Sequence, residues 1–266
     1  TKLTTCKLRK PVSFVQLDNN PNHIIASFEL ERHDMNKSWY EQTNLFHGSI
    51  EFINDNGKGH VRITHTAPET KDLAEEILNI QVKRYKQKGT IPLEVTPKKI
   101  LFSEFTNETR FIFFYRLTTQ LQNEIFTCEN IKDISIKPEE DYVLPEGISW
   151  MNRMKKILIS GDSLDKTFFM SEKSYHSSLV LWNIEAVFSF DYKGGKGTIT
   201  ICLGFPDYNK KMHNAEFEIT IRSLNIKNRL TSKAKKTLES KLLSEMDKQK
   251  SLVYSNFIEY LNNQKK

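Results

Sequence analysis

The sequence predicts an α+β protein: two antiparallel β-meanders, each followed by a helix, with a long helix at the C-terminus. Runs of alternating apolar residues recur in both halves of the chain, and such alternation is typical of strands that bury one face. Each set of runs precedes a stretch with apolar residues at helical spacing. The composition agrees, because 38% hydrophobic residues, including 17 phenylalanines, can form a sizeable core.

In the first half, strands are expected at residues 23–32, 44–53 and 60–65. Asn56-Gly57 lies between the last two, and this dipeptide favours a hairpin turn because both residues tolerate positive φ. A helix is expected next, over residues 66–89. Thr66 and Glu69 have the spacing of a capping box at its start, and Gly89 suits its end.

The middle of the chain is less regular. A helix is predicted after Thr106 and one or two short strands within residues 123–137. Residues 138–147 are acidic and contain two prolines, so we expect a linker there, between an N-terminal α+β domain (1–142) and a C-terminal α+β domain (143–266). Residues 145–161 then predict a helix with Ile148, Met151, Met154 and Leu158 as its buried stripe, followed by a loop over 162–175.

The last third gives the clearest pattern. Seven alternating apolar positions from Val180 to Tyr192 predict one long strand, with further strands at 198–205 and 215–224. From Asn228 onward, leucines at helical spacing predict one long helix. Its apolar stripe is expected to pack on its own domain; a protein partner is the alternative.

The most motif-like stretch is FDYKGGKGTITI, residues 190–201. A phosphate-binding P-loop requires GxxxxGK[ST] followed by a helix, whereas here Lys196 precedes Gly197 and a strand follows. The flanking alternation therefore predicts a hairpin turn.

Composition and charge exclude some classes of protein. The net charge is +6, a modest excess that permits binding to DNA or RNA without requiring it. The three cysteines have neither disulfide-framework nor zinc-site spacing, so we expect a reducing, cytoplasmic environment and no resident metal. No run approaches the roughly 20 apolar residues of a membrane helix, so no membrane partner is expected.

Basic residues cluster on predicted helices and one turn, where they could follow a phosphate backbone. The nucleic-acid-binding candidates are Lys83, Arg84, Lys86, Lys88, Arg153, Lys155, Lys156, Lys193 and Lys196. Tyr85 and Trp150 could stack on bases. The alternative is that these are solvated helix faces.

The polar face of the last predicted sheet carries several carboxylates, which could hold Mg²⁺ through oxygen ligands. The order helix, three strands, helix over residues 145–246 resembles the core of the PD-(D/E)xK nucleases, and this resemblance implies Asp191, Glu216 and Glu218 as catalytic candidates. The chain departs from that family in two places. The second strand lacks the family's acid, and Glu216-Phe217-Glu218 stands where E-x-K is usual.

These observations together predict a non-catalytic binding protein that acts on nucleic acid or as a subunit of a protein complex, with no cofactor. The alternatives are a Mg²⁺-dependent nuclease and a purely structural subunit. A surface on which the basic residues lie together would favour the binding protein. Close approach of Asp191 and Glu218 would favour the nuclease.

Overall fold

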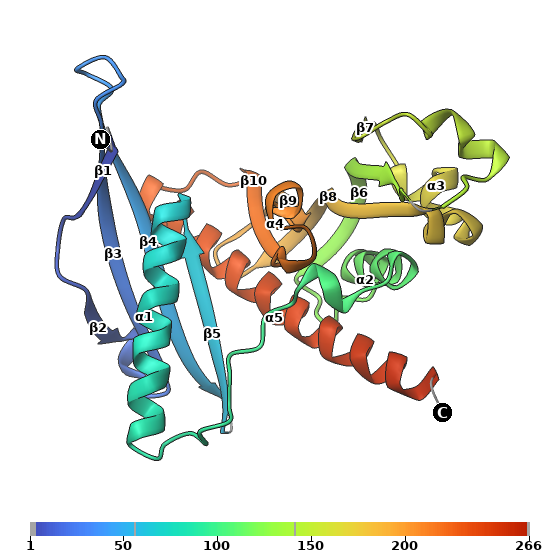
Figure 1. Ribbon diagram of the computed structural model, residues 1–266. Helices are drawn as coiled ribbons and strands as arrows, with labels where there is room; N and C mark the ends of the chain where they lie inside the picture. The colour runs from blue at the N-terminus through green and yellow to red at the C-terminus, as the bar shows by residue number, and fades with distance from the viewer. Residues whose placement is uncertain (1–3, 56, 141, 265–266) are drawn as a thin grey trace. The chain divides into compact units, whose positions relative to one another are not determined.

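The computed structural model describes residues 4–55, 57–140 and 142–264. Its contacts divide the chain into two compact units, Thr1–Pro97 and Lys98–Lys266. Both units contain an antiparallel sheet with helices, so the predicted α+β class is confirmed (Figure 1).

The first unit is a five-stranded antiparallel sheet with one long helix on a single face (Figure 1). Its elements are β1 (Thr4–Leu8), β2 (Ser13–Gln16), the short 3-10 turn η1 (Leu17–Asn19), β3 (His23–Asp34), β4 (Thr43–Asp55), β5 (Lys58–His65) and α1 (Pro68–Gln87). The strand order is β1-β3-β4-β5, and β2 pairs with β3 beyond the end of β1. The three predicted strands are thus present, whereas β1 and β2 were not predicted.

The core of the first unit lies between the sheet and α1. Ala26, Phe28 and Ile50 face Ala74 and Leu78 of the helix. Their burial explains why alternation along β3 and β4 identified these strands, because every second side chain meets α1. At the β4–β5 turn, Gly57 has a φ of 82°, while Asn56 lies outside the described residues.

The start of α1 differs from the predicted capping box. Ala67 is the N-cap, and the Thr70 hydroxyl accepts a hydrogen bond from the Ala67 amide at 3.1 Å. Thr66 instead exchanges hydrogen bonds with the backbone of His47. Glu69 forms an ion pair with Arg32 at 3.0 Å. Thr66 and Glu69, the two predicted capping residues, therefore make tertiary contacts instead of capping the helix.

The second unit contains another five-stranded antiparallel sheet, of order β10-β9-β8-β6-β7. Its strands are β6 (Phe126–Pro138), β7 (Ile157–Ser160), β8 (Leu179–Tyr192), β9 (Gly195–Gly204) and β10 (Glu218–Ile226). Its α-helices are α2 (Asn107–Thr119), α3 (Phe168–Ser171), α4 (Tyr208–Lys211) and α5 (Ser232–Gln264). Short 3-10 turns complete it: η2 (Phe102–Glu104), η3 (Glu146–Met151), η4 (Leu164–Lys166), η5 (Lys173–Ser178) and η6 (Met212–Asn214).

Helices α2 and α5 pack against each other and against the second sheet. Phe257 of α5 is fully buried, and its ring lies 5.6 Å from both Phe105 and Phe113. Leu242 and Met246 of α5 are fully buried in the same core. The apolar stripe of the last helix is therefore buried in the core of its own unit.

The predicted helix over residues 145–161 is wrong. Only residues 146–151 form a helical turn, η3, and residues 157–160 form strand β7, which pairs with β6. Ile148 and Met151 are buried as predicted, but Met154 and Leu158 are exposed. Pairing with the free edge of β6 therefore outweighs the local helical spacing.

The contacts place the boundary between the two units at Pro97 and Lys98, whereas the sequence predicted it between residues 142 and 143. Strand β6 precedes the expected linker but pairs along its length with β8, so it belongs to the second sheet. The linker residues that the structure describes lie inside the second unit, and Leu144 is buried there.

The glycines of FDYKGGKGTITI form a hairpin turn, as predicted. Tyr192 pairs with Gly195, which leaves Lys193 and Gly194 as a two-residue loop, and Gly194 has a φ of 110°. A Cβ on Gly197 would lie 1.9 Å from the Asn225 carbonyl oxygen, so the neighbouring strand also requires glycine there.

Candidate nucleic-acid interface

The predicted catalytic carboxylates do not form one site. In the sheet register Glu218 lies opposite Gly204, and Gly204 opposite Asn183, whereas Asp191 is eight residues further along β8. At a rise of about 3.3 Å per residue, these carboxylates are separated by about 26 Å along the sheet. Asp191 and Glu218 are therefore too far apart to bind one metal ion, as a nuclease centre would require.

The carboxylates of this sheet are paired with cations instead. Asp191 forms an ion pair with Lys196, Glu185 lies 3.5 Å from Arg222, and Glu216 lies 3.1 Å from Lys99. Among the residues that the structure describes, no group of three or more His, Cys, Asp or Glu side chains could hold a metal ion. The polar sheet face thus gives no support to metal-dependent chemistry.

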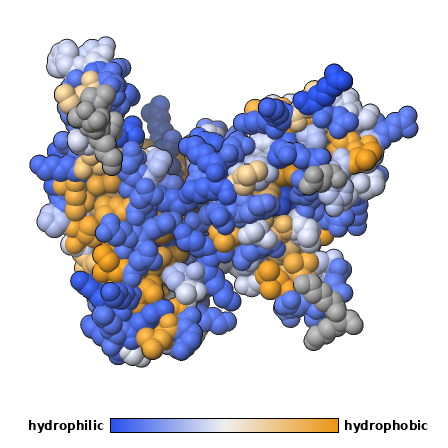
Figure 2. All heavy atoms as spheres, in the orientation of Figure 1, coloured by the Kyte–Doolittle hydropathy of each residue, from blue (hydrophilic) through white to orange (hydrophobic). Residues whose placement is uncertain are grey.

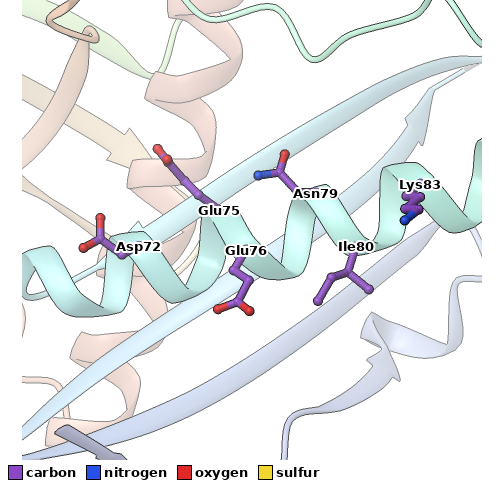
Figure 3. A pocket seen from close by; sticks show the side chains of 6 residues that line it. All are labelled: Asp72, Glu75, Glu76, Asn79, Ile80 and Lys83. Carbon is purple, nitrogen blue, oxygen red and sulfur yellow. The ribbon is translucent and has the colours of Figure 1, made fainter.

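The basic candidates of α1 lie on a helix surface that also carries acids. A shallow hollow of about 420 Å³ on this helix is lined by Asp72, Glu75, Glu76, Asn79, Ile80 and Lys83. Figure 3 shows that all six side chains project from α1. Because Lys83 shares this surface with three carboxylates, the potential over the hollow is not that of a phosphate-binding track. Arg84, Lys86 and Lys88 follow at the C-terminal end of the helix.

The strongest candidate site is a cleft in the second unit, with a volume of about 560 Å³. Three segments line it: residues 137–140 at and after the end of β6, residues 152–155 between η3 and β7, and Tyr208, Asn209 and Met212 around α4. We call it the β6–α4 cleft. It brings two predicted nucleic-acid-binding residues, Arg153 and Lys155, together with Lys137.

A stack of buried rings holds one wall of the cleft. The Tyr208 ring lies 4.4 Å from Phe102 and 5.4 Å from Trp182, so its position is fixed by contacts on the core side. The Arg110 guanidinium lies 3.5 Å from the centroid of the Phe102 ring, behind this layer. Since only 7% of Tyr208 is exposed, its ring offers no open face for base stacking.

Arg110 is a buried cation, 2% exposed, without a direct carboxylate partner among the described residues. It donates to Asn107 Oδ1 at 2.9 Å and to the Phe105 carbonyl at 3.2 Å. Asn107 in turn donates to Glu139 at 2.8 Å, so an amide bridges the arginine to a residue of the cleft. Burial lowers the pKa of Arg110 to about 9, and nearby Tyr208 and Glu139 oppose that shift.

Lys137 is the least exposed cation of the cleft. Burial by itself lowers its pKa, but the Glu140 carboxylate, 3.2 Å away, and the Tyr208 hydroxyl raise the pKa above its ordinary value. The ammonium group therefore stays charged at neutral pH. Arg153 and Lys155 are both exposed. The lining residues carry three cations and two carboxylates.

The remaining basic candidates lie elsewhere in the second unit. Lys156 is exposed and directly precedes β7. Lys193 and Lys196 belong to the β8–β9 hairpin, at the opposite end of β8 from Val180, which pairs with Lys137. Twelve strand residues place about 40 Å between that hairpin and the cleft, so the two do not form one continuous site.

Sequence reasoning identified Arg153 and Lys155 but not Lys137 or Tyr208. Lys137 occurs at the end of an irregular strand and Tyr208 in a turn, with no local pattern that sets either apart. They join the site only through the pairing of β6 with β8 and the aromatic stack.

The hydropathy of the surface and the comparisons with known proteins do not point to a further site. Figure 2 shows hydrophilic residues over most of one face, with apolar side chains gathered in patches, several of them on the first unit. Within the described residues, no helix is both long and apolar enough to span a lipid bilayer. Comparisons with models of protein families, with curated proteins and with solved structures find no match for this chain.

Proposed function

We propose that this protein binds a nucleic-acid strand without catalysing a reaction on it, and that the strand's phosphates lie in the β6–α4 cleft. The observation that supports this most directly is the meeting of Lys137, Arg153 and Lys155 in one cleft. Ammonium and guanidinium groups bind phosphate oxygens, and arginine does so with two parallel hydrogen bonds.

The neighbouring residues support the same function. Trp150 is exposed and lies three residues before Arg153 in the chain, where its ring is available to stack on a base. Glu139 and Glu140 limit the net charge of the cleft, which favours a few local phosphate contacts over a long basic track. The three free thiols fit the intracellular placement that we propose with this function.

Fluorescence anisotropy with labelled single-stranded RNA and DNA oligonucleotides, at two salt concentrations, tests the proposal. The double variant R153E/K155E is expected to weaken binding by about tenfold or more at low salt. For single strands each phosphate contact contributes about 0.7 to the slope of log K against log salt, so losing two contacts should flatten the slope by about 1.4.

The matched control is K235E/K236E, which makes the same charge change at exposed lysines in the first turns of α5. It should bind nearly as well as the unaltered protein. Equal losses in both double variants would mean that net charge alone governs binding, and no binding of either oligonucleotide at low salt would contradict the proposal.

A further inference from the structure

Met212 has a backbone conformation that residues with a side chain rarely adopt. Its φ is 45° and its ψ is −114°. Ser163 also has a positive φ, of 55°, but its ψ of 42° places it in the left-handed helical region, which residues other than glycine adopt occasionally. The ψ of Met212 lies far from that region, so glycine alone fits this position without strain.

The turn around Met212 imposes this conformation. The Met212 amide donates to the Tyr208 carbonyl, and the Ala215 amide donates to the Met212 carbonyl at 3.1 Å. Tyr208 and Ala215 are both buried in the core of the second unit. Because both of these anchors are fixed, the fold holds Met212 in a conformation that is unfavourable for its side chain.

The strained residue lies in the candidate site. Met212 lines the β6–α4 cleft, and 52% of it is exposed. Packing in the core therefore does not explain why a methionine occupies a position that suits glycine. Strained residues cluster at sites where ligands bind, and the strained side chain then often takes part in the binding.

A second exposed methionine lines another part of the cleft. Met154 belongs to the segment of residues 152–155 and is 43% exposed, whereas Met212 follows α4. Most of the other lining residues are polar or charged. The two thioether side chains therefore offer apolar contacts to one part of a ligand, and methionine sulfur makes favourable contacts with aromatic rings.

A nucleotide has the chemistry that this combination fits. It joins an anionic phosphate to a flat aromatic base, and Arg153 and Lys155 supply cations in the same cleft. The volume of about 560 Å³ is in the range of about 300–1,000 Å³ that is typical of small-ligand sites, so a base has room beside a phosphate. A base that enters the cleft cannot also be paired in a duplex.

We propose that Met212 and Met154 contact one unpaired base of the bound strand, and that Met212 is a specificity-determining residue that favours single strands over duplexes. This inference rests on the proposed function, because the base belongs to the strand whose phosphates lie in the cleft. It gives the strained side chain a role in binding the base rather than in stabilising the fold.

Substitutions at Met212 separate the side chain from the backbone. M212A removes the thioether but keeps a Cβ, so it should weaken binding of a single-stranded oligonucleotide by about threefold to tenfold with little change in stability. M212G should weaken binding equally but raise the melting temperature by about 2–4 °C, because glycine relieves the strain. The control M35A removes an exposed methionine from the first unit and should change neither quantity.

An abasic oligonucleotide separates this inference from the proposed function. It has the same phosphates but no bases, so the unaltered protein should bind it more weakly than the matching strand with bases. M212A should reduce that difference by about threefold to tenfold, because the lost contact is one that only the base makes. A duplex of the same sequence should bind more weakly than the single strand, although its charge density is higher.

Each measurement has a result that would overturn the inference. Equal binding of the abasic and base-containing strands, or a difference that M212A leaves unchanged, would exclude the base contact while the phosphate contacts remain. Tighter binding of the duplex, or a lower melting temperature of M212G, would also contradict it. Absence of binding to every oligonucleotide at low salt would overturn the proposed function together with this inference.

Discussion

At the scale of single residues, His176 shows how burial sets the chemistry of a side chain. Its ring stacks on Phe111 with centroids 4.1 Å apart, and Nε2 lies 3.1 Å from the Met170 carbonyl. Burial lowers the pKa of His176 below its ordinary value of 6.5, outweighing the backbone hydrogen bond that favours the charged form. The folded protein therefore holds this histidine neutral.

The lowered pKa predicts acid sensitivity of the second unit. As pH falls below 6.5, the unfolded chain binds a proton at His176 before the folded chain does, so the free energy of unfolding decreases. The variant H176F keeps an aromatic ring against Phe111 but cannot bind a proton. Urea unfolding between pH 7 and pH 5, followed by the fluorescence of buried Trp182, should show a shallower loss of stability in H176F. Equal pH dependence in the two proteins would contradict this account.

At the scale of elements, the packing of α5 decides between the two alternatives for its apolar stripe, contact with its own unit and contact with a protein partner. Leu238, Leu242, Met246, Val253 and Phe257 are all buried, at the spacing that the sequence showed. The Tyr254 hydroxyl also donates to Glu104 at 2.7 Å, which ties the helix to the segment before α2. The stripe therefore stabilises the second unit.

Replacing Phe257 tests this packing. F257A should lower the free energy of unfolding by about 3–5 kcal/mol, because it removes the stacking on Phe105 and Phe113 and leaves a cavity. The neighbouring N256A alters an exposed position and should change stability by about 0.5 kcal/mol or less. A helix that leaves its unit to meet a partner would instead make F257A nearly neutral in the isolated protein.

Elements were predictable where one face is buried and the other is polar. Residues 180–192 alternate because the same face of β8 meets the core throughout. The helix prediction for residues 145–161 failed because their apolar residues have helical spacing. Pairing of residues 157–160 with β6 determines the structure instead. The cleft was half predictable for the same reason: its loop cations form a local cluster, but Lys137 and Tyr208 reach it only through long-range contacts.

At the scale of the whole molecule, the position of β6 decides where the chain divides. It pairs with β7 on one side and β8 on the other, so it is an interior strand of the second sheet. A domain beginning at residue 143 would lack this strand and the whole of α2.

Two fragments test the division. Residues 98–266 should unfold in one cooperative thermal transition, because they retain the complete second sheet and its core. Residues 143–266 should show no such transition, since both neighbours of β6 lose their partner. Circular dichroism during heating distinguishes the two. A cooperative transition of the shorter fragment would restore the boundary that the sequence suggested.

The central claim is that the β6–α4 cleft holds the nucleic-acid strand. The most direct measurement is photo-crosslinking of the full chain to 4-thiouridine-containing RNA, with the crosslinked peptides identified by mass spectrometry. The account predicts crosslinks within residues 150–155 and 208–212, and their loss in R153E/K155E. Crosslinks confined to residues 83–88 of α1 or to the β8–β9 hairpin would contradict it.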